Sequence, residues 1–131
     1  KARELSKNPH AEFLSYWHTV ERQVRISGKV KKIPADEADN YFKTRPRGSQ
    51  IGAWASPQSE AVKDKNELDV LYEKYEKKFE NKNIPKPGFW GGYKLVPLRF
   101  EFWQMQPHRF HDRVLYSLEK NGLWKIKRLA P

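Results

Sequence analysis

Alternation of apolar and polar side chains over residues 22–32 is the feature that most limits how this chain can fold. Val24, Ile26 and Val30 fall on one side of an extended strand, and the polar residues between them fall on the other. Because a period of two buries only one face, the pattern predicts a half-buried antiparallel strand. Asn121-Gly122 lies between segments 113–119 and 123–129, and it is the strongest short-range hairpin signal in the chain.

The remaining segments add strands and helices to this sheet. A Pro-led helix is expected from Pro34 to about Phe42, and a short helix is expected with Ser49 as its N-cap. Asp64-Lys-Asn-Glu67 resembles a capping box and predicts the start of a longer helix. Further strands are expected at 11–17 and 93–104, and a short helix at 2–7. The predicted fold class is mainly antiparallel β with interspersed helices, in a single domain over residues 1–131.

Composition limits the core and the chemistry. The chain has 131 residues, of which 37% are hydrophobic and 14% aromatic, so we expect one modest core built largely on rings. The sequence contains no cysteine, which excludes disulfides and thiolate metal sites and fits a cytoplasmic location. No apolar run approaches the length of a membrane helix and no signal peptide is visible, so no membrane association is expected.

The net charge of +10 raises the question of a nucleic-acid partner. The basic excess lies in residues 1–32 and 94–128, whereas residues 63–86 carry nearly balanced charges typical of a solvated helix face. No sequence signature of a nucleic-acid-binding module accompanies the charge. Anionic small molecules explain the excess equally well, and we expect no nucleic-acid partner.

The segment 101–113 combines aromatic and charged residues. Arg109, His111 and Arg113 have the i, i+2, i+4 spacing that would bring them to one face of a strand, close to Trp103. Three potential cations beside an indole suit a flat, anionic, aromatic ligand better than a hydrophobic core. The same alternation would separate His111 from Asp112, which argues against an acid–base pair.

A second candidate site is the turn Arg45-Pro-Arg47, which leads into a predicted helix. Guanidinium groups and free backbone N–H groups at a helix N-terminus bind phosphate, and Tyr41 and Ser49 lie nearby in sequence. Taken alone, Arg-Pro-Arg is weak evidence for such a site, because this pattern is more often an ordinary surface turn. Gln58-Ser59 offers hydrogen-bonding groups for the edge of a heterocycle. The histidines lack clustered ligand partners, so we predict no metal site.

A series of motifs runs in order from Lys1 to Pro131. They are Arg22-Gln-Val, Tyr41-Phe, Arg45-Pro-Arg-Gly-Ser-Gln-Ile-Gly-Ala-Trp, Gln58-Ser, Trp90-Gly-Gly, Glu101-Phe-Trp-Gln, Arg109-Phe-His-Asp-Arg113 and Trp124-Lys-Ile. Together they resemble the pyridoxamine/pyridoxine 5′-phosphate oxidase family. The resemblance implies an FMN-binding split β-barrel with the cofactor at a homodimer interface. It also implies oxidation of pyridoxine or pyridoxamine 5′-phosphate to pyridoxal 5′-phosphate, with O₂ as acceptor and H₂O₂ as product.

The resemblance assigns roles to individual residues. FMN contacts are implied for Lys1, Gln23, Gln58, Ser59, Trp103 and Arg113. Contacts to the substrate phosphate are implied for Tyr41, Arg45 and Ser49. Arg109 and His111 are implied to lie over the substrate's pyridine ring as catalytic residues, with Phe110 between them in the substrate site.

The chain departs from the family pattern at three places. Met105 stands where the family usually has glycine, which predicts a reshaped loop because Met lacks glycine's backbone freedom. Phe110 replaces the usual aliphatic residue. The family's segment before Lys1, with further barrel strands, is not part of this sequence, and we therefore expect a C-terminal portion that includes the family's dimerisation region. The alternative is a non-catalytic, truncated flavin-fold module that binds pyridoxal phosphate or a protein partner.

Overall fold

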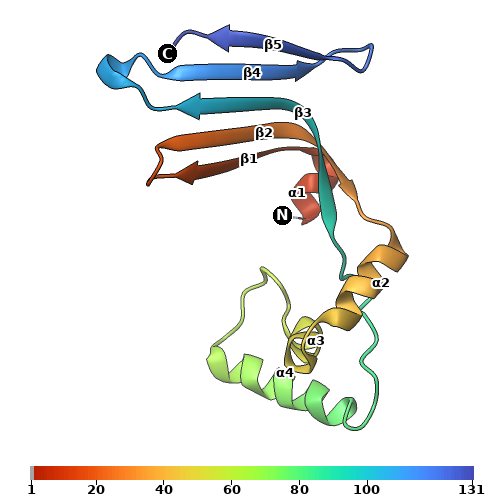
Figure 1. The fold of residues 1–131 in the computed structure, drawn as a ribbon. Coiled ribbons are helices and arrows are strands. Elements are labelled where there is room, and N and C mark those ends of the chain that lie inside the picture. The colour runs from red at the N-terminus through yellow and green to blue at the C-terminus, as the bar shows by residue number, and fades with distance from the viewer. Residues whose placement is uncertain (1) are drawn as a thin grey trace. The chain divides into compact units, whose positions relative to one another are not determined.

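The computed structural model describes residues 2–131, which form two compact units. The first, called the sheet unit here, contains the described residues up to Lys31 together with Tyr93–Pro131. The second, called the helical unit, contains Lys32–Gly92. Both are labelled by element in Figure 1, and each is described by itself below.

The sheet unit is built on five strands in the order β1-β2-β3-β4-β5 (Figure 1). Its elements are α1 (Ala2–Lys7), β1 (His10–Trp17), β2 (Arg22–Lys32), β3 (Tyr93–Gln104), η1 (Pro107–Arg109), β4 (Asp112–Leu118) and β5 (Trp124–Leu129). The pairs β1–β2, β3–β4 and β4–β5 are antiparallel. The predicted antiparallel fold class is therefore confirmed, together with the expected hairpin.

Two glycines explain local features of this sheet. A Cβ atom on Gly28 would lie 2.0 Å from the carbonyl oxygen of Val96, so only glycine allows β2 to approach β3 this closely. In the β4–β5 hairpin, Gly122 has a φ of 82°, and the Asn121 side chain accepts a 2.9 Å hydrogen bond from the N–H of Leu123. Asn-Gly thus supplies the turn chemistry that the sequence indicated.

The two faces of the sheet differ in character. On one face, Phe100 stacks with Phe102 and contacts Trp124, with ring centroids 6.2 Å and 5.2 Å apart. Tyr116 packs edge-on against Phe102 on the same face. The opposite face carries ion pairs, described below. Several rings remain well exposed, including Phe102 at 43%, so the sheet unit buries little of its own apolar surface.

The helical unit contains α2 (Ala35–Thr44), α3 (Arg47–Ala55) and α4 (Lys65–Lys78). Its core consists of Phe42, Ile51, Phe79 and Ile84, surrounded by half-buried rings. Asp64 is the N-cap of α4 and accepts a hydrogen bond from the N–H of Glu67, as the capping-box pattern predicted.

Two helix starts differ from the prediction. Pro34 is the N-cap of α2 and not its first residue. Ser49 is not an N-cap, because α3 begins at Arg47 with Pro46 in the capping position. The physical reason is that the ring of proline fixes φ near the helical value, which favours proline at the start of a helix. Among the described residues, every helix is too short or too polar to traverse a lipid bilayer.

The predicted strand through residues 109–113 is wrong at its start. Pro107–Arg109 form a short 3₁₀ turn, and β4 begins only at Asp112. His108 and Arg109 have φ values of 58° and 62°, which are incompatible with a strand. Pro107 lacks the N–H that a ladder would need, and the chain turns here. Arg109, His111 and Arg113 therefore do not alternate along one strand.

Candidate functional site

Three of the candidate residues share one face of the sheet unit. Trp103 on β3 is the direct cross-strand partner of Arg113 on β4. Gln23 on β2 is the partner of Tyr16 on β1, whose ring lies 6.4 Å from that of Trp103. Since cross-strand partners point to the same side, an amide, an indole and a guanidinium come together on this face.

Arg113 is held firmly in place. Its Nε and Nη2 donate to Oε1 of Glu101 over 2.9 Å and 2.7 Å, and its Nη1 donates to the carbonyl oxygen of Ala130 over 3.0 Å. Of the five N–H bonds of a guanidinium, these contacts use three. The side chains of Arg113 and Glu101 are largely buried, at 27% and 11% exposure. The remaining donors of Arg113 are thus presented in a fixed orientation.

His111 lies directly before β4 and packs on the same indole. Its ring centroid is 4.8 Å from that of Trp103, at an interplanar angle of 45°. Its Nδ1 is 3.3 Å from the N–H of Gln106, which donates to it. A neutral imidazole that accepts at Nδ1 carries its proton on Nε2, so His111 has a donor available on its other side.

Arg109 and Phe110 lie on the surface of the 3₁₀ turn. Phe110 is 77% exposed, and Arg109 is also exposed. The positive φ of Arg109 is unusual for a residue with a Cβ atom, and such strain is characteristic of functional positions. Met105, in contrast, has no positive φ, and its N–H donates to the carbonyl oxygen of Glu21 over 3.0 Å.

In the helical unit, Tyr41 and Arg45 lie one turn apart at the C-terminal end of α2 and contact the same ring. Trp90 stacks with Tyr41 at a centroid distance of 6.1 Å and an angle of 19°. The Cζ atom of Arg45 lies 5.3 Å from the centroid of Trp90. Tyr41 is 62% exposed, so both polar groups border solvent on one surface of the helical unit.

Ser49 lies in the first turn of α3, close in sequence to Arg45. The N-cap residue Pro46 offers no side-chain hydrogen bond to the start of α3. Free N–H groups at the helix start can therefore add to the hydroxyl of Ser49 and the guanidinium of Arg45. The role of Ser49 and Arg45 in a phosphate cradle stays a prediction.

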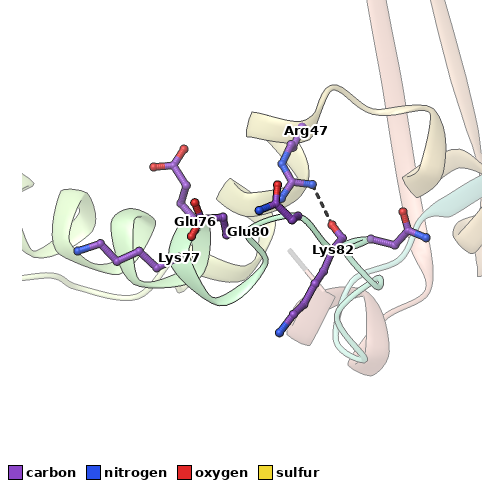
Figure 2. Close-up of a pocket in the computed structure, with 7 residues that line it drawn as sticks. Arg47, Glu76, Lys77, Glu80 and Lys82 are labelled. Atoms are coloured by element: carbon purple, nitrogen blue, oxygen red, sulfur yellow. Dashed lines mark hydrogen bonds between the residues drawn. The ribbon is translucent and has the colours of Figure 1, made fainter.

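Arg47 does not belong to that cradle. Its Nη1 donates to the carbonyl oxygen of Lys82 over 3.0 Å, as Figure 2 shows. Its Nη2 donates to the carbonyl oxygen of Phe79. These carbonyls follow α4, so Arg47 closes the C-terminal end of that helix. The neighbouring open pocket is lined by Arg47, Glu76, Lys77, Glu80, Asn81, Lys82 and Asn83 (Figure 2). It contains none of the residues assigned to cofactor or substrate.

The remaining assigned residues are Gln58, Ser59 and Lys1. Gln58 and Ser59 are exposed in the turn after α3, and Ser59 has a φ of 65°. They belong to the helical unit, whereas Gln23, Trp103 and Arg113 belong to the sheet unit. Lys1 lies outside the described residues.

Two residues with clear structural roles at these sites had no role in the sequence analysis. Glu101 orients Arg113, and Trp90 contacts both Tyr41 and Arg45. Both occur in the motifs quoted above. Glu101 lies two positions before Trp103 and carries the charge opposite to that of Arg113. Because Trp103 is the cross-strand partner of Arg113, this spacing was the signal for the ion pair. No sequence spacing connects Trp90 with α2.

The charged face of the sheet unit contains a second network. The Glu12 carboxylate accepts hydrogen bonds from the hydroxyl of Ser27 at 2.7 Å and from Arg25 at 2.7 Å and 2.9 Å. These contacts, the one to Ser27 above all, lower the pKa of Glu12 below its usual value of 4.5. The same pairing raises the pKa of Arg25.

Two family models match the chain. Residues 1–79 match the model described as pyridoxamine 5′-phosphate oxidase. Residues 90–131 match the model described as the pyridoxine 5′-phosphate oxidase C-terminal dimerisation region. Together they cover most of the chain, which confirms the resemblance read from the motifs.

Curated relatives extend over the whole chain. The pyridoxine/pyridoxamine 5′-phosphate oxidases of Synechocystis sp. and Rippkaea orientalis are 49% and 47% identical over 131 residues. That of Cupriavidus taiwanensis is 48% identical. The chain spans 61–62% of the length of these relatives.

Solved structures agree on the fold. PhzG from Burkholderia lata, crystallised with tetrahydrophenazine-1-carboxylic acid, is 30% identical with a TM-score of 0.88, over all of this chain and 63% of that one. A pyridoxamine 5′-phosphate oxidase-related, FMN-binding protein from Nostoc punctiforme is 14% identical with a TM-score of 0.65, over 99% of this chain and 67% of that one. The second likeness bears on the fold alone. Together they confirm the expected split-barrel fold class.

Proposed function

The chain belongs to the pyridoxamine 5′-phosphate oxidase family, and on that premise we propose that it is part of an FMN-dependent oxidase that produces pyridoxal 5′-phosphate. Pyridoxine 5′-phosphate and O₂ give pyridoxal 5′-phosphate and H₂O₂. Pyridoxamine 5′-phosphate consumes one water in addition and releases ammonia. The observation that carries this proposal is that Gln23, Trp103 and Arg113 share one face of the sheet unit. In the helical unit, Tyr41 and Arg45 contact the same indole.

The helical unit supplies the groups for the substrate phosphate. Tyr41 and Arg45 share one surface at the end of α2, and Ser49 follows in the first turn of α3. A phosphate dianion accepts hydrogen bonds from hydroxyls, from a guanidinium and from helix N–H groups, and all three kinds of donor occur here. Arg47 is excluded because its guanidinium is already bound to two carbonyl oxygens.

The side chains of the sheet unit fit a flavin phosphate and ring. Trp103 offers a half-buried aromatic surface, Arg113 keeps two N–H donors beyond those used by Glu101 and Ala130, and Gln23 adds an amide on the same face. These residues of the sheet unit would hold FMN. The further FMN contacts that the resemblance implies for Gln58, Ser59 and Lys1 stay predictions. When bound, FMN would supply the acceptor for the hydride that leaves the substrate's C4′, and O₂ would take up the electrons from the reduced flavin.

The chain's own residues bind and orient the substrate. Arg109, exposed on a strained turn, places a cation beside the pyridine ring, where it restricts the substrate's orientation and stabilises negative charge. His111 is held in place by the ring of Trp103 and by the N–H of Gln106, so that its Nε2–H can donate a hydrogen bond to a substrate oxygen or nitrogen. Phe110 adds an apolar surface beside them.

We further propose a homodimer with FMN at the interface. Support comes from the dimerisation-region model that matches residues 90–131 and from the large exposed side chains of the sheet unit, such as Phe102 and Ile126. A cytoplasmic location and the absence of nucleic-acid partners stay predictions from the sequence.

The test uses the protein expressed from its complete reading frame and loaded with FMN. Pyridoxine 5′-phosphate is added in air, and the absorbance of pyridoxal 5′-phosphate and the release of H₂O₂ are followed. Equal amounts of both products support the oxidase. FMN-loaded protein that binds pyridoxal 5′-phosphate without turnover would instead favour the non-catalytic module.

A further inference from the structure

Trp90 is the one aromatic side chain in contact with both candidate phosphate ligands on α2 among the described residues. Its indole stacks on the ring of Tyr41 and lies 5.3 Å from the guanidinium carbon of Arg45. Tyr41 and Arg45 are four residues apart, the spacing that brings side chains to one helix face. A single ring from a distant loop thus contacts both.

The loop that carries Trp90 is fastened to α2. The N–H of Trp90 donates to the carbonyl oxygen of Pro87 over 3.0 Å, and its own carbonyl oxygen accepts from Nζ of Lys86 over 3.2 Å. The same Nζ pairs with Asp39 of α2 at 3.4 Å. Pro87 is fully buried, so the position of the indole relative to α2 is well determined.

We propose that Trp90 is a positioning residue for phosphate recognition, holding Tyr41 and Arg45 in the arrangement that receives the substrate's phosphate. This inference rests on the proposed function, because it takes those two residues as phosphate ligands. A free arginine side chain samples many rotamers and loses that freedom on binding. The cation–π contact with the indole restricts the rotamers of Arg45 before the phosphate binds. Stacking on the same indole restricts the ring of Tyr41 in the same way.

A purely structural role makes a different prediction. Trp90 also packs edge-on against the buried ring of Phe42, with centroids 5.1 Å apart. If packing were its whole role, its removal would lower stability and weaken all ligands alike. A positioning role lowers the affinity selectively for ligands that carry a phosphate. The informative quantity is the ratio of the dissociation constants of pyridoxal and pyridoxal 5′-phosphate.

The experiment measures both dissociation constants and the FMN affinity for the FMN-loaded protein expressed from its complete reading frame. The variants are Trp90→Ala, Trp90→Leu and Trp90→Phe. Trp54→Phe is the matched control, because Trp54 is a half-buried tryptophan of the same unit that packs on Tyr75 and Phe79 instead. Thermal unfolding identifies variants that fail to fold.

We expect Trp90→Ala and Trp90→Leu to lower the affinity ratio about tenfold, with FMN affinity unchanged. Trp90→Phe should restore most of the ratio, because it keeps a ring, and Trp54→Phe should leave it as in wild type. If Trp90→Ala does not fold, the comparison of Trp90→Leu with Trp90→Phe decides between a positioning role and a purely structural role. An unchanged ratio in Trp90→Leu would overturn the inference. A wild-type protein that does not prefer pyridoxal 5′-phosphate over pyridoxal would overturn the proposed phosphate site itself.

Discussion

Replacement of Arg47 by alanine tests whether Arg47 and Arg45, which look equivalent in the sequence, have different roles. The guanidinium of Arg47 donates to the carbonyl oxygens of Lys82 and Phe79, at the end of α4. A hydrogen bond from a charged donor contributes about 1.5–3 kcal/mol, and less where water competes. Because the bond to Lys82 is exposed, we expect Arg47→Ala to lower the free energy of unfolding by about 2 kcal/mol. In a protein of the relatives' size this corresponds to about 4–8 °C in Tm.

The assay is thermal and urea unfolding alongside the affinity for pyridoxal 5′-phosphate. Arg45→Ala is the matched variant, because its guanidinium contacts only ring faces among the described residues. We expect it to cost less than about 1 kcal/mol of stability and to lower the phosphate-dependent affinity strongly. Arg47→Lys should recover part of the stability, since an ammonium group can donate to one of the two carbonyl oxygens but lacks the planar pair of donors that a guanidinium offers to both. If Arg47→Ala left stability intact and weakened pyridoxal 5′-phosphate binding, the assignment of Arg47 to helix capping would be refuted.

Three further changes probe other parts of the chain. Arg109→Ala should lower kcat by at least about 100-fold while FMN affinity, followed by flavin fluorescence, stays near wild type; equal losses of both would mark the residue as structural. Gly28→Ala should cost more than about 2 kcal/mol in urea unfolding, because its Cβ would collide with backbone atoms of Val96; a wild-type midpoint would contradict the close approach of β2 and β3. The pKa of Glu12 is lowered in the folded state, so its contribution to stability is complete above its ordinary value of 4.5 and is lost as the pH falls through the lower, folded pKa. Glu12→Gln should therefore flatten the acid side of the stability profile, and an identical profile would exclude the contribution.

The strand pattern and the hairpin could be predicted from the sequence because their causes are local. Alternation over 22–32 reflects the pleat of one strand, and Asn121-Gly122 meets the backbone demands of a tight turn. The same reasoning failed at Arg109. Its i, i+2 spacing to His111 suggested a strand, but Pro107 and two positive φ values make a turn there.

The candidate site was only partly visible in the sequence. Arg45 and Arg47 flank one proline and have similar local surroundings, yet only the tertiary fold brings the carbonyls after α4 to Arg47 and the indole of Trp90 to Arg45. Such contacts join segments more than thirty residues apart. No local pattern specifies these contacts, so the different roles of Arg45 and Arg47 could be recognised only in the structure.

The most direct test of the central claim is an anaerobic single turnover. The FMN-loaded protein is mixed with one equivalent of pyridoxine 5′-phosphate without O₂, and the visible absorption of the oxidised flavin is recorded. The proposed function predicts that this absorption is lost as pyridoxal 5′-phosphate forms, and that it returns with one equivalent of H₂O₂ when air is admitted. A flavin spectrum that stays oxidised although the substrate is bound would contradict the assignment of this chain to a hydride-transferring oxidase.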